Sequence, residues 1–219
     1  MSEFEAERRA GLVAVLVPLA AALAIAALAA LTQAKAWLQP ASRFHGRDVT
    51  SEHWKAAFSL TDSSGRVISL ADLKGKAVLL AFGYTHCPDA CPTTLARLAE
   101  VRRLMDKDAS RLQVVFVTID PERDTGQFLE RYVQAFDPTF VGLRGTDAQT
   151  DAAATAFHAD YDITDYRGQI FVSHTVDTYL IDPDGRVRDV LPHTLSAREI
   201  AEDVRTVLTA EAGCWPRGA

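Results

Sequence analysis

Cysteine and basic charge are both scarce in this 219-residue chain, and each scarcity argues against a class of protein. Three cysteines are too few for a disulfide-rich secreted scaffold. The 23 lysines and arginines are outnumbered by 29 aspartates and glutamates, and they form no stripe along the sequence. A net charge of −6 without a basic patch argues against nucleic-acid binding. The 48% apolar and 24% charged content is typical of a globular domain.

Charge is absent altogether between Arg9 and Lys35. About 20 residues at ~1.5 Å rise per residue span a hydrocarbon core of about 30 Å, so we predict a transmembrane helix over residues 10–34. A cleaved signal peptide is the alternative, because Ala34-Lys35-Ala36 resembles a cleavage site. Signal peptides, however, have apolar regions of only about 7–15 residues. The longer run favours an uncleaved anchor.

A polar, irregular stretch follows this apolar run. Residues 35–52 include Pro40 and Gly46 and are predicted to be a linker. The folded domain is expected over residues 53–210, and residues 211–219 form a tail. Cys214 in this tail belongs to no motif, so it could pair between chains or stay free.

Strand and helix patterns alternate within the domain. Short apolar runs predict strands, 3.6-residue periodicity predicts helices, and the last two strands read as a hairpin that turns at Asp184-Gly185. This order predicts an α/β sandwich with a central mixed sheet. Strands are expected on either side of Ser64-Gly65 and in 77–84, 112–120, 139–145 and 175–191; helices are expected from Pro92 and in 124–136, 147–158 and 197–209.

Cys87 and Cys91 lie in the stretch FGYTHCPDACPTTL, where a buried strand gives way to a helix. Residues four apart on a helix share a face, and their separation suits either a disulfide or a common metal ion. The start of a helix also favours the thiolate form of cysteine. Spacing alone does not decide among a disulfide, a redox couple and a metal site.

A metal site here needs a third ligand, and His174 is the best-placed histidine. In a thioredoxin-like sheet the strand that follows it would lie beside the strand that leads to the cysteines. His86 adjoins Cys87, but neighbouring side chains at a turn point apart, so we expect it to tune the site rather than bind the metal. Two thiolates and one imidazole suit copper, especially Cu(I), better than structural zinc, which normally takes four ligands.

These residues resemble the Sco/SenC family of copper-binding, thioredoxin-fold proteins. GKAVLLAFGYTHCPDACPTTL, VTIDPERDT and SHTVDTYLIDPDGRV stand in the family's order and spacing, and the likeness extends over about residues 53–209. The resemblance implies that Cys87, Cys91 and His174 bind one copper ion. Asp120, in the second motif, is shared with the family and is expected either to support the ligands or to shape the turn before the next helix.

The resemblance also implies a role in assembling the CuA centre of cytochrome c oxidase. The partner would be the CuA-bearing subunit, with neither nucleic acid nor a small-molecule substrate. The chain would cross the inner membrane once, with residues 1–9 in the cytoplasm and the domain in the periplasm, or in the mitochondrial intermembrane space. In such a compartment Cys87 and Cys91 can also form a disulfide.

Two enzyme functions compete with this copper chaperone. In a thiol-disulfide oxidoreductase, Cys87 would attack a client disulfide and Cys91 would resolve the mixed disulfide. A peroxidase resembling peroxiredoxins is a weaker alternative. Thioredoxin-like reductases generally carry CxxC and a proline opposite it, whereas this chain has CxxxC and no proline from Thr139 to Asp182. The sequence therefore favours a carrier over a catalyst.

Overall fold

A computed structural model of the protein describes residues 43–167 and 169–210. The predicted transmembrane helix over residues 10–34, the N-terminal residues 1–9 and the tail with Cys214 lie outside these ranges. Within them, no helix combines the length and the apolar character needed to cross a bilayer.

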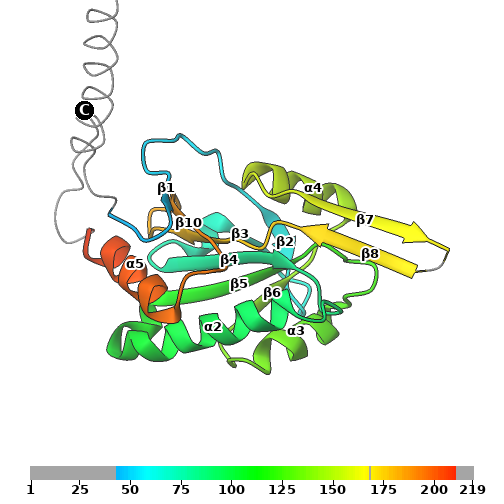
Figure 1. Ribbon diagram of the computed structural model, residues 1–219, viewed down its shortest axis with the longest axis horizontal. Coiled ribbons are helices and arrows are strands. Elements are labelled where there is room, and N and C mark those ends of the chain that lie inside the picture. Colours follow the sequence, from blue (N-terminus) through cyan, green and yellow to red (C-terminus); the bar gives the residue numbers. More distant parts are fainter. Residues whose placement is uncertain (1–42, 168, 211–219) are drawn as a thin grey trace, which may run out of the picture. The chain divides into compact units, whose positions relative to one another are not determined.

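A six-stranded mixed sheet forms the centre of the fold (Figure 1). Its order is β1-β10-β9-β4-β5-β6; β4, β5 and β6 are parallel, and β9 is antiparallel to β4. The predicted α/β architecture with a central mixed sheet is confirmed. The strands of this sheet are β1 (Arg47–Asp48), β4 (Ala77–Gly83), β5 (Leu112–Thr118), β6 (Val141–Leu143), β9 (Thr178–Ile181) and β10 (Val187–Leu191).

The middle strands carry the core. All seven residues of β4 are buried, as its continuous apolar sequence predicts for a strand covered on both faces. Helices α2 and α5 lie side by side against the sheet (Figure 1). The helices are α2 (Ala90–Met105), α3 (Gly126–Gln134), α4 (Asp147–Ala156) and α5 (Ala197–Ala210), with short 3₁₀ helices η1 (Leu70–Leu73) and η2 (Asp106–Arg111).

Two helix starts show the capping chemistry expected from the sequence. The Thr146 hydroxyl accepts a hydrogen bond from the Gln149 N–H at 3.3 Å, and the Gln149 side chain accepts one from the Thr146 N–H at 2.9 Å. Ser196 and Glu199 repeat this arrangement before α5. The helix predicted from Asp124 instead begins at Gly126, because the backbone of Thr125 before it is extended.

Two small antiparallel sheets flank the central one. The pair β2 (Ser59–Thr61) and β3 (Val67–Ser69) confirms the strands predicted around the Ser64-Gly65 turn. The pair β7 (Tyr161–Tyr166) and β8 (Gln169–His174) was not predicted. This second hairpin projects from the body of the domain (Figure 1).

Part of the predicted linker packs on the domain. Residues 43–52 of the predicted range 35–52 are described, and within them Arg47–Asp48 pairs with β10. Phe44 is 4% exposed and Val49 is fully buried. Although the stretch is polar in composition, these two apolar side chains pack into the core and hold it on the domain.

Two carboxyl groups share a buried space between β10 and α5. Asp189 and Asp203 are both fully buried. The Asp203 carboxylate accepts a hydrogen bond from the His45 N–H at 3.1 Å and lies 2.8 Å from its Nδ1 atom. Burial, followed by the charge of Asp203, raises the pKa of Asp189 to about 7.

We expect Asp189→Asn to stabilise the protein at alkaline pH. Folded Asp189 releases its proton near pH 7 and the unfolded residue near pH ~4, so stability falls as pH rises between these values. The asparagine amide can donate to Asp203 at every pH, so the free energy of unfolding should rise by roughly 1–3 kcal/mol at pH 8 and change little at pH 4. Urea denaturation at both pH values measures this, and equal midpoints at pH 8 would contradict it.

Candidate metal centre

The turn between β4 and α2 positions both cysteines. The Cys87 N–H donates to the Tyr84 carbonyl at 3.3 Å, which closes the turn after β4. Cys91 lies in the first turn of α2, and its N–H donates to the Cys87 Sγ atom at 3.4 Å. Cys87 therefore precedes the helix rather than lying on it, but the two side chains still face one another. Both are free thiols.

A glycine at the end of β4 makes room for the buried sulfur. A Cβ atom on Gly83 would lie 2.6 Å from the Cys91 Sγ atom and 2.8 Å from the Phe116 ring. Both distances are far below van der Waals contact. The absence of a side chain at residue 83 thus lets Cys91 pack directly against the strand.

His174, the last residue of β8, completes the group. Its Nδ1 atom donates to the Thr175 carbonyl at 2.8 Å, which leaves Nε2 as the ligand atom of the neutral ring. This Nε2 atom lies 3.6 Å from the Cys91 Sγ atom, and the ring stands edge-on to Tyr84 at 5.9 Å. The next strand, β9, pairs with β4 as predicted.

The ligand atoms of Cys87, Cys91 and His174 all lie within 4.8 Å of one another. Among the described residues this is the only group of three or more cysteine, histidine or acidic side chains close enough to hold a metal ion. Two sulfurs and one imidazole nitrogen form a donor set for soft or borderline metals.

The two thiols differ in acidity. Burial alone would raise the pKa of Cys87, but hydrogen bonds from the Cys91, Asp89 and Ala90 amides and the Cys91 thiol outweigh it, so the pKa is lowered. Cys91 is 3% exposed, and burial raises its pKa to about 12. The apo site therefore pairs an acidic, half-buried thiol with a buried one that holds its proton.

Burial also acts on the imidazole. It lowers the pKa of His174, against an opposing effect of the bond to the Thr175 carbonyl. The ring is therefore neutral at physiological pH, the state in which imidazole binds metals.

Asp124 is a structural element of the site that the sequence reasoning missed. Its carboxylate is fully buried and accepts hydrogen bonds from the Thr85 N–H at 3.0 Å and the Thr118 hydroxyl at 2.6 Å. The Thr85 hydroxyl donates to it as well, at 2.5 Å. Asp124 thus ties the cysteine turn to the loop after β5. The only signal in the sequence was its place in the VTIDPERDT motif.

The two candidate supporting residues, Asp120 and His86, both form contacts with residues close to them in the chain. Asp120 is 5% exposed; it forms an ion pair with Arg123, and its N–H donates to the Thr118 hydroxyl at 3.0 Å. These contacts fit the turn-shaping role. The exposed His86 ring bonds the Thr85 hydroxyl through Nδ1 at 3.1 Å, and this nitrogen lies 3.6 Å from the Asp124 carboxylate.

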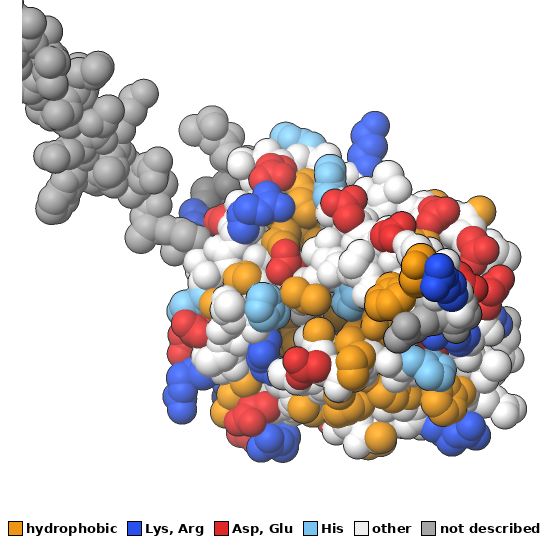
Figure 2. Space-filling view, turned by 45° about the vertical axis from the view of Figure 1, so that its right-hand side comes forward, with side chains coloured by type: hydrophobic (Ala, Val, Ile, Leu, Met, Phe, Trp, Pro, Cys, Tyr) orange, Lys and Arg blue, Asp and Glu red, His pale blue; other side chains and the backbone are white. Residues whose placement is uncertain are grey.

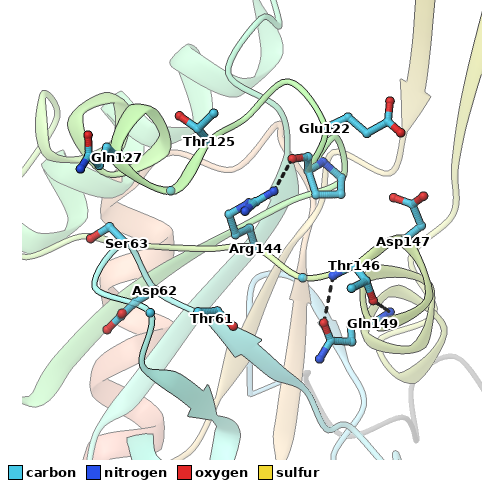
Figure 3. Close-up of a pocket in the computed structure, with 14 residues that line it drawn as sticks. Thr61, Asp62, Ser63, Glu122, Thr125, Gln127, Arg144, Thr146, Asp147 and Gln149 are labelled. Carbon is cyan, nitrogen blue, oxygen red and sulfur yellow. Dashed lines mark hydrogen bonds between the residues drawn. The ribbon is translucent and has the colours of Figure 1, made fainter.

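A separate cavity of about 690 Å³ is lined in part by Pro121, Glu122 and Thr125, from the loop that carries Asp124 (Figure 3). Arg144 extends along it and donates to the Pro121 carbonyl at 2.6 Å. Hydroxyl, amide and carboxylate groups line the rest, and no cysteine or histidine is among them. The cavity and the three-ligand group are therefore distinct.

Comparison with known proteins places this geometry in a family. The family model described as SCO1/SenC matches residues 47–209. The chain is 39% identical over 157 residues to "Protein SCO2 homolog, mitochondrial" of Bos taurus and 38% identical over 157 residues to that of Homo sapiens. Each alignment covers 70% of this chain and 59% of the relative, so the chain spans less than two thirds of these relatives' length.

Solved structures agree with the sequence matches. ScoI of Bradyrhizobium japonicum with copper bound is 38% identical, with a TM-score of 0.64 over 69% of this chain and 97% of that one. Apo Sco1 of Thermus thermophilus is 34% identical, with a TM-score of 0.68 over 74% of this chain and 96% of that one. These likenesses confirm the predicted thioredoxin-like fold, and the chain belongs to the SCO1/SenC family.

Proposed function

We propose that this protein is a copper chaperone that binds one copper ion through Cys87, Cys91 and His174. The observation that carries the proposal is the convergence of these three ligand atoms within 4.8 Å, although His174 is 83 residues from Cys91 along the chain. The copper-bound structure of the related Bradyrhizobium japonicum protein supports the choice of metal. The family resemblance supports assembly of the CuA centre of cytochrome c oxidase as the task.

The chemistry of the site suits a carried ion. Two thiolates and an imidazole satisfy Cu(I), which is a soft metal ion. The bond from His174 to the Thr175 carbonyl fixes the ring with its unprotonated nitrogen toward the sulfurs. Cys91 must lose its proton when copper binds, so binding is coupled to proton release.

The predicted transmembrane helix in the N-terminal part of the chain determines the proposed location of the domain in the cell. Residues 10–34 form an anchor in the inner membrane, with residues 1–9 in the cytoplasm, and the predicted linker leads to the domain, on which its residues 43–52 already pack. The domain faces the periplasm, or the intermembrane space in a mitochondrion. There it meets the CuA-bearing subunit of the oxidase, the client of this proposal.

Thiol-disulfide exchange is the second candidate function, and the difference between the two cysteines favours it. The Cys87 thiolate would attack a client disulfide and form a mixed disulfide while one client sulfur leaves as a thiolate. Cys91, after losing its proton, would then attack Cys87 and release the second client sulfur. The client is reduced and Cys87–Cys91 becomes a disulfide, which an external dithiol must reduce before the next turnover.

Removing a proposed ligand should abolish tight copper binding. We expect His174→Ala, Cys87→Ser and Cys91→Ser each to lower the affinity for Cu(I) at least about 100-fold, because loss of a ligand's outer partner alone costs 10–100-fold. Competition against a Cu(I) chelator of known affinity measures this in the full-length chain.

His86→Ala provides the matched control for these variants. It removes an imidazole next to Cys87 that is expected to tune the site from outside the group of three ligand atoms, so its copper affinity should fall far less than that of His174→Ala. If His174→Ala bound copper as tightly as His86→Ala, the proposed ligand set would be wrong.

The two thiols of the apo protein should react at different rates. At pH 8 we expect iodoacetamide to modify Cys87 at least about tenfold faster than Cys91, because only the thiolate reacts and the pKa of Cys91 is raised to about 12. The Cys87 rate should rise with pH and level off as its thiol titrates. Peptide mass spectrometry after timed quenching measures both rates, and equal rates would contradict the acidities derived from the site.

A further inference from the structure

Exposed apolar side chains are concentrated on the β7–β8 hairpin. Most large hydrophobic residues of the described chain are buried, and exposed ones gathered in one place mark interaction surfaces. Four of the six that are exposed within residues 43–167 and 169–210 lie on this single hairpin. These four are Ile163, Tyr166, Ile170 and Phe171; the other two are Val67 and Phe128.

The register of the hairpin sorts these residues onto two faces. Tyr161 pairs with His174, Ile163 with Val172, and Asp165 with Ile170. Directly paired residues and every second residue along a strand share a face. Ile163 (40% exposed) and Ile170 (39% exposed) therefore lie on the face that carries His174. Phe171, at 52% exposure, lies on the opposite face.

A further apolar side chain lies on the cysteine side of the site. Phe128 of α3 is 41% exposed, and its ring centre is 5.9 Å from that of His86, the neighbour of Cys87. Figure 2 turns forward the right-hand side of Figure 1, where the β7–β8 hairpin lies, and shows hydrophobic side chains gathered among charged ones on this face. We call Phe128, Ile163 and Ile170 the docking surface.

Acidic residues accompany the docking surface. Asp89 lies between the two cysteines, Asp160 directly precedes the hairpin, and Asp165 pairs with Ile170 on the His174 face; all three are exposed. Arg167 is the one basic residue of the hairpin. A second copy of this chain, with its net charge of −6, or an anionic lipid surface would be repelled here. A protein with lysine or arginine around an apolar contact would be attracted.

We propose that the docking surface binds the protein that exchanges copper with this site, an inference that rests on the proposed function. Direct ligand exchange brings the partner's thiolates within bonding distance, ~2.3 Å, of an ion held by Cys87, Cys91 and His174. The partner must then cover the surface beside His174 and Cys87. The expected partner presents soft ligands, an apolar contact and a cationic rim.

The test measures copper transfer from the full-length, copper-loaded chain to the apo CuA-bearing domain of the oxidase. Ile170→Glu places a charge on the His174 face, and Phe171→Glu places the same charge on the next residue of the opposite face. We expect Ile170→Glu to slow transfer at least about tenfold, as truncating an interface hot spot does, and Phe171→Glu to stay close to the parent. Copper content of the separated acceptor gives the rate.

Transfer to dithiothreitol is the control reaction. This small neutral dithiol needs no docking surface, so all three donors should lose copper to it at the same rate. Transfer from the parent to the protein acceptor should also slow as salt concentration rises, because exposed charges steer the encounter.

Each contrary result has a distinct meaning. A parent that binds copper but transfers none to the domain overturns the proposed client, and this inference with it. Parent-like transfer by Ile170→Glu, or equal slowing by Phe171→Glu, overturns the inference and leaves the proposed function standing. Slower loss of copper from Ile170→Glu to dithiothreitol would show that the substitution affects the copper site itself and not the docking of a partner. Dimers, or binding to vesicles of phosphatidylcholine and phosphatidylglycerol, that Ile170→Glu abolishes would identify a different occupant.

Discussion

The pairing of β9 with β4 is the interaction on which the metal centre depends. Ala81 pairs with Thr178 and Val78 with Ile181, so the chain enters β9 at the edge of the sheet where β4 leads to the cysteine turn. His174 lies only four residues before that entry point. A slip of one residue would turn the side chains of β9 to the other face of the sheet. Because β4 and β9 are buried along their whole length, such a slip is costly.

Backbone and carboxylate contacts hold the cysteine turn without help from a metal. Asp124 binds the Thr85 N–H and the Thr118 hydroxyl, and Gly83 lets Cys91 pack against the strand. A buried carboxylate is stable only when it is well hydrogen-bonded, and that requirement makes the contact specific. The positions of the ligand side chains are therefore set by the fold, and binding of an ion requires little further ordering of the cysteine turn.

The sequence predicted those parts of the fold whose signals are local. Three features could be predicted from neighbouring residues alone: the apolar run of β4, the helix caps at Thr146 and Ser196, and the paired cysteines. His174 was identified because strand order in a thioredoxin-like sheet placed it near the cysteines. For Asp124 the sequence indicates only a helix start, since nothing near it in the sequence shows that Thr85, 39 residues away, donates to it. The β7–β8 hairpin escaped prediction because a projecting ribbon buries neither face and so lacks a clean alternation of apolar and polar residues.

The two cysteine ligands differ in exposure, and this difference decides which of them an incoming group can reach. Cys91 is almost fully buried and its thiol is hard to ionise, whereas Cys87 is half-buried and its pKa is lowered. An incoming sulfur, whether from a copper client or from a disulfide substrate, can reach Cys87 without disturbing the core, but it cannot reach Cys91 in this way. Both proposed chemistries therefore begin at the same exposed atom. Both also need the reduced pair, because a Cys87–Cys91 disulfide has no thiolate left to bind copper or to attack a client disulfide. The redox state of this pair would then decide whether the protein can perform either reaction, and a copper ion bound to Cys87 would block thiol exchange.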